Sequence, residues 1–221
     1  TQLGTDTLTL AATDGHRLAV KTLKARPSAG STPSEGAAEG ADSVIIPARA
    51  LQEVARVLKG DGVVEMSMGR SRNHVFFTLD GVEVMSRLIE GTYPNYNQVV
   101  PPEPANTTIT LNTKDLHERA RAVAIFARDS ANVVRIKTEA GEIAISATTS
   151  EVGSSEASVS AEIEGADIQI AFNSRYLLDV LGLLGSEKAV LNFNGPLSPG
   201  VVRPAGKDDY TYVIMPVRVA M

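Results

Sequence analysis

Three stretches of the chain share one order of hydrophobic and polar positions. They read VIIPARALQEVARVL, ITLNTKDLHERARAV and IAFNSRYLLDVLGLL, at residues 44–58, 109–123 and 170–184. In each stretch a short alternating segment, typical of a strand, runs into a polar turn, and leucines at helical spacing follow. The pattern predicts a strand followed by a helix at each place, with the helices beginning near residues 48, 113 and 174.

Capping residues support these three helix starts. In the second and third stretches Asn112 or Thr113, and Asn173 or Ser174, stand where a side chain accepts hydrogen bonds from the first-turn amides. Pro47 suits the start of the first helix, because the missing N–H of a proline has no partner to lose there.

Segments with period-two alternation follow each predicted helix and predict three further strands each time. They are 63–68, 75–79 and 82–88 after the first helix, 133–138, 143–148 and 155–163 after the second, and 189–193, 200–203 and 210–217 after the third. The matching leucines Leu51, Leu116 and Leu177 lie 65 and 61 residues apart. The chain is therefore predicted to consist of repeated β-α-β-β-β units of roughly sixty residues.

Two such units make one domain, in which two helices pack on antiparallel sheets, an α+β fold. We assign residues 1–100 to a domain with an incomplete first unit and a proline-rich connector, and residues 101–221 to a complete domain. Because Thr1 already enters an apparent hairpin, we expect a fragment without its upstream part. The small, polar stretch Lys24 to Asp42 predicts a flexible surface loop.

Composition narrows the possible classes of protein. Hydrophobic residues make up 43% of the 221 and charged residues 21%, values typical of a globular protein. The absence of cysteine excludes disulfides and thiolate metal sites. No apolar run is long enough for a membrane span and no signal-like segment opens the chain, so we expect a cytosolic protein. A net charge of −5 argues against a nucleic-acid surface spread over the whole molecule.

Basic residues nevertheless share a register on the predicted helices. Lys114, Arg121 and Arg128 are spaced by seven, as are Arg49 and Arg56, while Arg175 holds the matching first position in the third helix. The apolar positions fall on the opposite side of each helix. Such cations can simply keep a helix face solvated. Their recurrence in three repeats favours non-specific contact with the phosphates of duplex DNA.

The stretch LAATDGHRLAV, at 10–20, raises the question of a catalytic site, a ligand pocket or a turn. A hydrolase built on Asp14 and His16 would need a nucleophile or a metal, and the other histidines, His74 and His117, have no ligand spacing to His16. We predict no metal site and place both of those histidines on the surface. Asp14, followed by Gly15, is a natural turn acceptor.

Four motifs carry a resemblance to a known family. ATDGHRLAV, SRLIEGTYPNYNQVVP, IAFNSRYLLDVL and YVIMPVRV resemble, in order and spacing, the second and third domains of the bacterial sliding clamp, the beta subunit of DNA polymerase III. The resemblance implies a DNA-clamp fold and a head-to-tail homodimeric ring that encircles duplex DNA at the nucleoid. It also implies a non-catalytic protein without a cofactor, with replicative and repair polymerases and the clamp loader as partners.

Partners of the family dock a short peptide, bearing a glutamine and hydrophobic residues, into a cleft between the second and third domains. Carried over by motif, the cleft residues are Thr13, Gly15, His16, Arg17, Leu18, Pro94, Gln98, Val99, Tyr176, Leu197, Pro199, Val213, Met215, Pro216, Val217 and Arg218. The aliphatic members and Met215 would accept apolar anchors, whereas His16, Arg17 and Arg218 would fix the polar groups of the peptide.

The sequence also departs from the family. Gln98 stands at a position that is often arginine, and the loop from Lys24 to Asp42 is longer than expected. The first domain is absent, and a chain without it could not close the usual ring. A domain that binds peptides but never DNA is therefore the alternative interpretation. Ionic strength would separate the two, since phosphate contacts weaken steeply with salt and an apolar peptide pocket does not.

Overall fold

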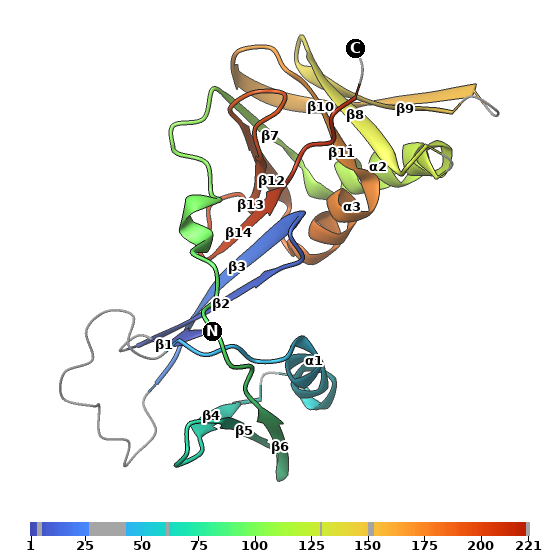
Figure 1. Cartoon of the computed structure of the whole chain (residues 1–221). Coiled ribbons are helices and arrows are strands. Elements are labelled where there is room, and N and C mark those ends of the chain that lie inside the picture. Colours follow the sequence, from blue (N-terminus) through green and yellow to red (C-terminus); the bar gives the residue numbers. More distant parts are fainter. Residues whose placement is uncertain (4–5, 27–42, 61, 129, 150–152, 220–221) are drawn as a thin grey trace. The chain divides into compact units, whose positions relative to one another are not determined.

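The computed structural model describes residues 1–3, 6–26, 43–60, 62–128, 130–149 and 153–219. The chain forms two compact units (Figure 1). Unit 1 comprises Thr1–Leu10 and Thr22–Pro94, and unit 2 comprises Ala11–Lys21 and Asn95–Met221. This division places the turn of the LAATDGHRLAV stretch in unit 2, while Leu10 stays in unit 1. The predicted domains, 1–100 and 101–221, divide the chain only once, and that boundary stays a prediction.

In the residues described for it, unit 1 holds one helix over a small sheet. Its elements, two of which continue into unit 2, are β1 (Gln2–Leu3), β2 (Thr7–Thr13), β3 (Arg17–Lys24), α1 (Ala48–Val57), β4 (Glu65–Met68), β5 (His74–Leu79) and β6 (Val82–Arg87). Strands β4, β5 and β6 pair antiparallel in that order. The buried face of β5, with Val75, Phe77 and Leu79, packs against Val54 of α1. Alternation along β5 therefore turns its apolar side chains toward the helix.

Unit 2 contains two complete β-α-β-β-β repeats after a short connector. Its elements are η1 (Tyr96–Gln98), β7 (Thr107–Asn112), α2 (Thr113–Ala127), β8 (Val133–Glu139), β9 (Glu142–Thr149), β10 (Gly153–Gly165), β11 (Gln169–Asn173), α3 (Ser174–Leu183), β12 (Lys188–Phe193), β13 (Gly200–Pro204) and β14 (Tyr210–Ile214). The predicted repeat and the predicted α+β class are confirmed here.

The strands of unit 2 pair antiparallel in the order β3-β14-β13-β12-β7-β10-β9-β8-β11. The part of β3 that joins this order is Arg17 to Lys21, paired with Ile214 to Tyr210. β10 is long enough to pair with β9 through its first half and with β7 through its second. The hairpin strand that carries Arg17 is thereby fixed beside β14, which carries Val213.

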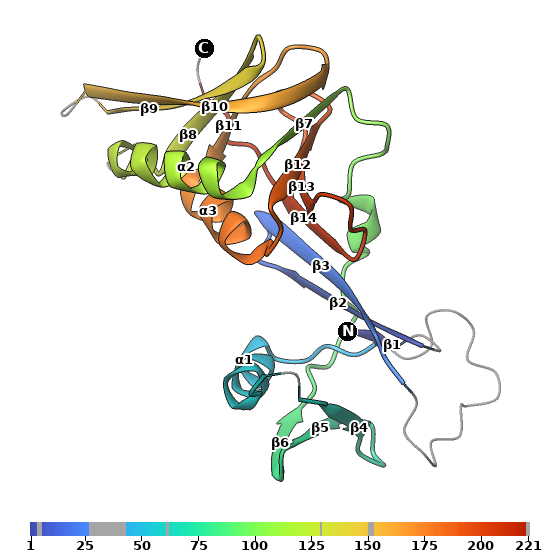
Figure 2. The ribbon, with the colours of Figure 1, turned by 180° about the vertical axis from the view of Figure 1, so that it is seen from behind.

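Helices α2 and α3 lie side by side on the strands of unit 2 (Figure 2). Their buried residues, including Leu116, Val123 and Leu177, join one core with Phe172 and Phe193 from the strands. The three predicted starts are confirmed, since the helices begin at Ala48, Thr113 and Ser174. The open choice of cap is resolved toward asparagine: Asn112 Oδ1 accepts from Asp115 N and Asn173 Oδ1 accepts from Arg175 N.

Several predicted boundaries are wrong. The strand expected before the first helix is reduced to isolated bridges, Gln2 with Ser43 and Ile45 with Ile89. The strand expected at 63–68 begins only at Glu65, and Val63 is exposed. The last strand ends at Ile214 instead of 217, because its partner strand β3 begins at Arg17, opposite Ile214, and Pro216 has no N–H to pair. Most of the predicted loop, residues 27–42, lies outside the described residues.

Candidate functional site

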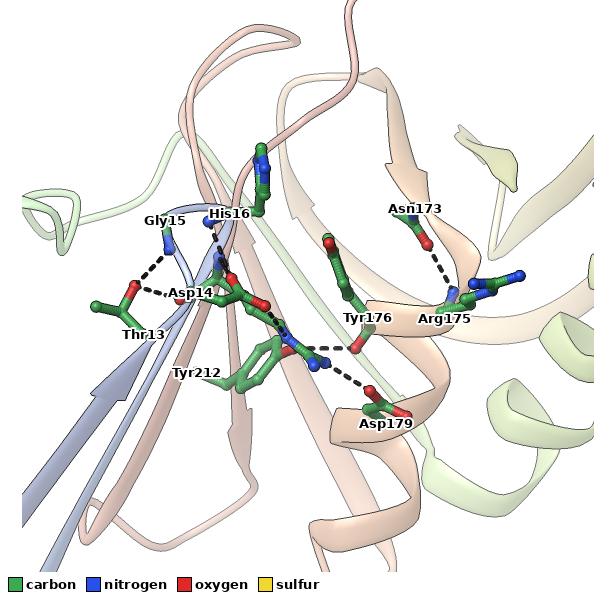
Figure 3. A network of polar contacts seen from close by, with 10 residues as sticks. Thr13, Asp14, Gly15, His16, Asn173, Arg175, Tyr176, Asp179 and Tyr212 are labelled. Carbon is green, nitrogen blue, oxygen red and sulfur yellow. Dashed lines mark hydrogen bonds and ion pairs between the residues drawn. The ribbon is translucent and has the colours of Figure 1, made fainter. Parts of the chain in front are cut away.

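Asp14, Gly15 and His16 form the turn between β2 and β3, which is held by its own side chains (Figure 3). Asp14 Oδ1 accepts hydrogen bonds from the backbone N–H groups of His16 and Arg17, at 3.0 and 3.1 Å. Thr13 Oγ1 donates to the Arg17 carbonyl at 2.7 Å and accepts from Gly15 N at 3.1 Å. Gly15 has a φ of +88°, a conformation that favours glycine. The predicted turn role of Asp14 is confirmed.

These contacts also affect the ionisation of Asp14. Partial burial raises the pKa of Asp14, but hydrogen bonds from the His16 N–H and from Arg17 hold this pKa below its ordinary value. The carboxylate is thus kept charged and engaged within the turn. Such a group is an acceptor for local donors and is poorly suited to general acid catalysis near neutral pH.

Arg17 connects this turn to helix α3. Its Nε donates to Asp14 Oδ2 at 2.9 Å, and its Nη1 donates to Asp179 Oδ2 at 2.5 Å and to the Tyr212 hydroxyl at 3.3 Å (Figure 3). The guanidinium carbon lies 4.4 Å from the centre of the Tyr176 ring. We name Asp14, Arg17, Tyr176, Asp179 and Tyr212 the corner network.

Tyr176 is held both by His16 and by Tyr212 of the corner network. The His16 ring stacks on it, with centroids 6.3 Å apart and planes 18° from parallel. The Tyr212 hydroxyl donates to the Tyr176 carbonyl at 3.2 Å. Burial raises the pKa of Tyr212 to about 12, against the lowering effect of Arg17, so this hydroxyl keeps the proton that it donates.

An apolar cluster lies in the same compact unit. Leu18, Val201 and Val213 are its buried members, and Ala11, Val20, Tyr96, Val99 and Val100 pack against them. The 3-10 helix η1 brings Tyr96 and Val99 to this cluster, with Asn95 Oδ1 accepting from Asn97 N at its start. We name these residues the apolar cluster. Three predicted pocket residues, Leu18, Val99 and Val213, are thus brought together.

The segment after β14 runs between the turn and β11. Met215 N donates to the His16 carbonyl at 2.9 Å, and Val217 N donates to the Ala171 carbonyl at 2.8 Å. Met215, Pro216 and Val217 are half-buried and Arg218 is exposed. These backbone bonds place Met215 next to the turn that carries His16.

The remaining predicted pocket residues have different surroundings. Leu197 is 64% exposed, Pro199 is half-buried and Gln98 is exposed. The loop that carries Leu197 and Pro199 is closed by a hydrogen bond from Ser198 N to the Gly195 carbonyl, whereas Gln98 is the last residue of η1. Pro94, also exposed, is the last residue of unit 1.

Sequence reasoning missed Asp179, Tyr212, Tyr96 and Val201. Asp179 follows Tyr176 by three residues on a predicted helix, a spacing that places both on one face. Tyr212 and Val201 adjoin predicted pocket residues along strands. A sequence signal therefore existed for Asp179, but none that named Arg17 as its partner.

The predicted basic positions are all on exposed helix surface. Lys114, Arg121 and Arg128, which we name the α2 stripe, are exposed, whereas Leu116, Val123 and Ala127 are buried. Arg49 is exposed in the first turn of α1 and Arg56 in its last turn. Arg175 is exposed in the first turn of α3. Arg119 adds an exposed cation on α2 that the heptad register did not predict.

Acidic neighbours reduce the positive charge at two of these positions. Lys114 Nζ lies 3.9 Å from Glu118 Oε1, and Arg56 Nη2 lies 2.7 Å from Glu53 Oε2. Within the described ranges, Arg121 and Arg128 form no ion pair. Two guanidinium groups of the α2 stripe are therefore unneutralised by the described residues.

Other chemistry finds little support in the described part of the chain. There, no group of three or more His, Cys, Asp or Glu side chains is arranged to hold a metal. His74 and His117 are half-buried rather than fully exposed, and His74 Nδ1 lies 2.6 Å from Asn73 Oδ1. None of the described helices combines the length and apolarity of a bilayer-crossing segment.

Comparison with known proteins gives consistent matches along the chain. Residues 1–95 match the family model of the DNA polymerase III beta subunit, central domain, and residues 97–218 match that of its C-terminal domain. The beta sliding clamp of Pseudomonas putida is 31% identical over 219 residues, 99% of this chain and 56% of the relative. That of Synechocystis is 34% identical over 221 residues, 97% of this chain and 56% of the relative.

Solved structures agree with the sequence matches. The sliding clamp of Pseudomonas aeruginosa, crystallised with a ligand, gives a TM-score of 0.86 at 32% identity over 99% of this chain and 57% of that chain. The Bacillus subtilis clamp gives a TM-score of 0.86 at 28% identity, over 99% of this chain and 56% of that one. The chain thus spans little more than half the length of these relatives.

Proposed function

Because the chain belongs to the family of bacterial sliding clamps, the beta subunits of DNA polymerase III, we propose that it forms the partner-binding part of a DNA polymerase processivity factor. In this role the whole protein is a non-catalytic homodimeric ring around duplex DNA. The ring keeps a polymerase at the primer end without tight binding to any base. The chain spans 56% of the curated relatives, so ring closure belongs to the longer protein.

The exposed helix cations support contact with DNA. Lys114, Arg121 and Arg128 follow one face of α2, opposite the face that enters the core. Arg121 and Arg128, which form no ion pair among the described residues, can attract phosphates and read no sequence. We propose that this face, together with Arg49, Arg56 and Arg175, lies toward the encircled duplex.

The apolar cluster and the corner network carry the proposal of peptide binding. Leu18 and Val213 provide a buried base, while Leu197, 64% exposed, leaves a large apolar side chain available to a partner. His16 and Tyr176 supply stacked rings, and half-buried Met215 adds an adaptable apolar surface. A partner peptide with aliphatic and aromatic anchors matches this combination. We propose that replicative and repair polymerases and the clamp loader bind here.

Titration with a peptide tests this proposal directly. A fluorescent peptide with a glutamine followed by leucine and phenylalanine should bind saturably, and its alanine-substituted control should not. In Met215→Ala the affinity should fall about tenfold, because a partly buried methionine contributes on the order of 1–2 kcal/mol. Met66→Ala is a matched control, since Met66 packs in the core of unit 1.

The control variant should bind the peptide like the wild type. Equal binding of the wild type and Met215→Ala would place the peptide elsewhere. A folded chain that binds the peptide and its alanine-substituted control equally, or binds neither, would contradict the proposed function.

A second candidate function is a peptide-binding module that never contacts DNA. The net charge of −5 favours it, because an acidic chain as a whole repels the DNA polyanion. DNA binding that weakens steeply with salt would exclude this alternative.

We further propose the organisation of the whole protein. Residues 1–100 and 101–221 would be its second and third domains, and an upstream domain would meet the third domain of a second copy. Its place of work would be the cytoplasm, at the nucleoid. A gel-filtration mass of twice the full-length chain would support the homodimer, and a monomeric mass at micromolar concentration would contradict it.

A further inference from the structure

Arg17 is engaged within the protein to an unusual extent for a residue expected to meet a ligand. Its Nε–H and both N–H groups of Nη1 have acceptors, in Asp14, Asp179 and the Tyr212 hydroxyl. Its face is covered by the Tyr176 ring at 4.4 Å. The side chain is only 29% exposed. Three of the five N–H groups of the guanidinium are thus engaged within the protein, which fixes its orientation.

The contacts of Arg17 also fix the position of Tyr176. The guanidinium of Arg17 lies against the Tyr176 ring. The Tyr212 hydroxyl, which accepts from Arg17, donates in turn to the Tyr176 carbonyl at 3.2 Å. Asp179 lies one helical turn beyond Tyr176 on α3, so the acid and the ring flank Arg17 from a single element. Loss of Asp179 would therefore release the end of Arg17 nearest to α3.

We propose that Asp179 is a positioning residue of the peptide-binding surface, and that Arg17 braces the turn against α3 instead of contacting the peptide. This inference rests on the proposed peptide binding. Through Arg17, Asp179 sets the position of the Tyr176 ring and of the turn that carries His16. It acts without touching the peptide.

The charges of the corner support this division of roles. One guanidinium lies between two carboxylates, Asp14 and Asp179, with side chains 44% and 56% exposed. The three groups together carry a net charge of −1, so an acidic peptide side chain would meet repulsion rather than a free cation. The exposed His16 and the uncovered part of the half-buried Tyr176 remain as the contacts that a partner can use.

A double-mutant cycle on the 221-residue chain tests the brace. Peptide affinity is measured for wild type, Asp179→Asn, Arg17→Met and the double variant. Each single variant should weaken binding about three- to tenfold, since a partly exposed charge-assisted bond is lost. The double variant should be no weaker than the weaker single variant, because both changes break one brace.

Asp208→Asn is the matched control, because it removes the same charge from an exposed loop of unit 2. It should bind the peptide within twofold of the wild type. Wild-type affinity in Asp179→Asn would overturn the inference. So would losses that multiply in the double variant, which would indicate that Arg17 contacts the peptide independently of Asp179.

Nuclear magnetic resonance of the unliganded chain provides a readout that does not depend on the peptide. The Arg17 Nε–H should exchange with water more slowly than that of exposed Arg119. In Asp179→Asn this exchange should accelerate and the Tyr176 ring signals should shift, with no change in Asp208→Asn. Unchanged signals in Asp179→Asn would refute the brace. A folded wild type that binds no peptide would instead contradict the proposed function.

Discussion

Two regions of unit 2 hold their cations in opposite ways. In the corner network, Arg17 has two carboxylates, a hydroxyl and an aromatic ring as partners. On the α2 stripe, Arg121 and Arg128 are exposed and pair with no acid among the described residues. A charge with fixed partners shapes a surface for one kind of ligand, whereas a loosely held charge attracts any polyanion and lets it move. One compact unit thus combines an arginine held by fixed partners with arginines that have no ion-pair partner among the described residues.

The largest effect should come from the buried base of the proposed peptide surface. Leu18 is 2% exposed, and Leu18→Ala should lower the free energy of unfolding by about 2–4 kcal/mol, through lost burial and the cavity left behind. Urea unfolding followed by circular dichroism measures it. Arg121→Ala on the α2 stripe should change the same quantity by less than about 0.5 kcal/mol.

These two variants can disprove the contrast between a structural apolar cluster and a non-structural α2 stripe. A Leu18→Ala chain as stable as the wild type would mean that the apolar cluster contributes nothing to the core. A severe loss of stability in Arg121→Ala would mean that the α2 stripe is structural.

Salt should separate the two regions next. Raising the salt concentration from 50 to 200 mM should weaken binding of duplex DNA roughly hundredfold if about four phosphates are contacted. Peptide affinity should change less than about twofold over the same range. Fluorescence anisotropy with labelled duplex and labelled peptide measures both. Equal salt dependence of the two ligands would show that they share one electrostatic surface.

Charge reversal on the α2 stripe should have a smaller effect. Arg121→Glu combined with Arg128→Glu should weaken DNA binding roughly tenfold and reduce its salt dependence, because two phosphate contacts become repulsive. The peptide affinity should stay that of the wild type. Glu142→Lys combined with Glu156→Lys, on strands β9 and β10, alters charge elsewhere and serves as the control. A peptide affinity that fell with the stripe would contradict the separation of the two regions.

The smallest effect should be a dependence of stability on pH in the corner network. The pKa of Asp14 is lower in the folded chain than its ordinary value of 3.8, so its contribution is present above that value. The contribution is lost as the pH falls through the lowered pKa. Because the ion pair is partly exposed, it should stay below about 1 kcal/mol.

Unfolding of the wild type and Asp14→Asn between pH 6 and pH 2.5 provides the measurement. The gap in stability between the two should narrow toward the acid end. A constant gap would show that the charge of Asp14 does not contribute.

Much of the fold could be predicted from repetition in the sequence. Three aligned leucines, Leu51, Leu116 and Leu177, located three helices, because the residues around them alternate with the period of a helix. The same period separated buried Val123 from exposed Arg121. Local chemistry was also readable, since an aspartate before a glycine is a strong turn signal.

Contacts between distant segments were out of reach. Arg17 and Asp179 are 162 residues apart, and no local pattern links them. The strand expected at residue 44 was wrong because strand pairing depends on which neighbour is present, and only isolated bridges form there. The early end of β14 likewise depends on a tertiary contact, since its partner strand β3 begins at Arg17, opposite Ile214.

The most direct test of a clamp with a specific peptide surface is a calorimetric titration of the chain with the glutamine-leucine-phenylalanine peptide at 50 and 200 mM salt. One peptide should bind per chain at both salt concentrations, with nearly equal affinity, and Met215→Ala should lose about tenfold. Absence of binding by the folded wild type, or binding that vanishes at the higher salt, would contradict the proposed peptide-binding surface.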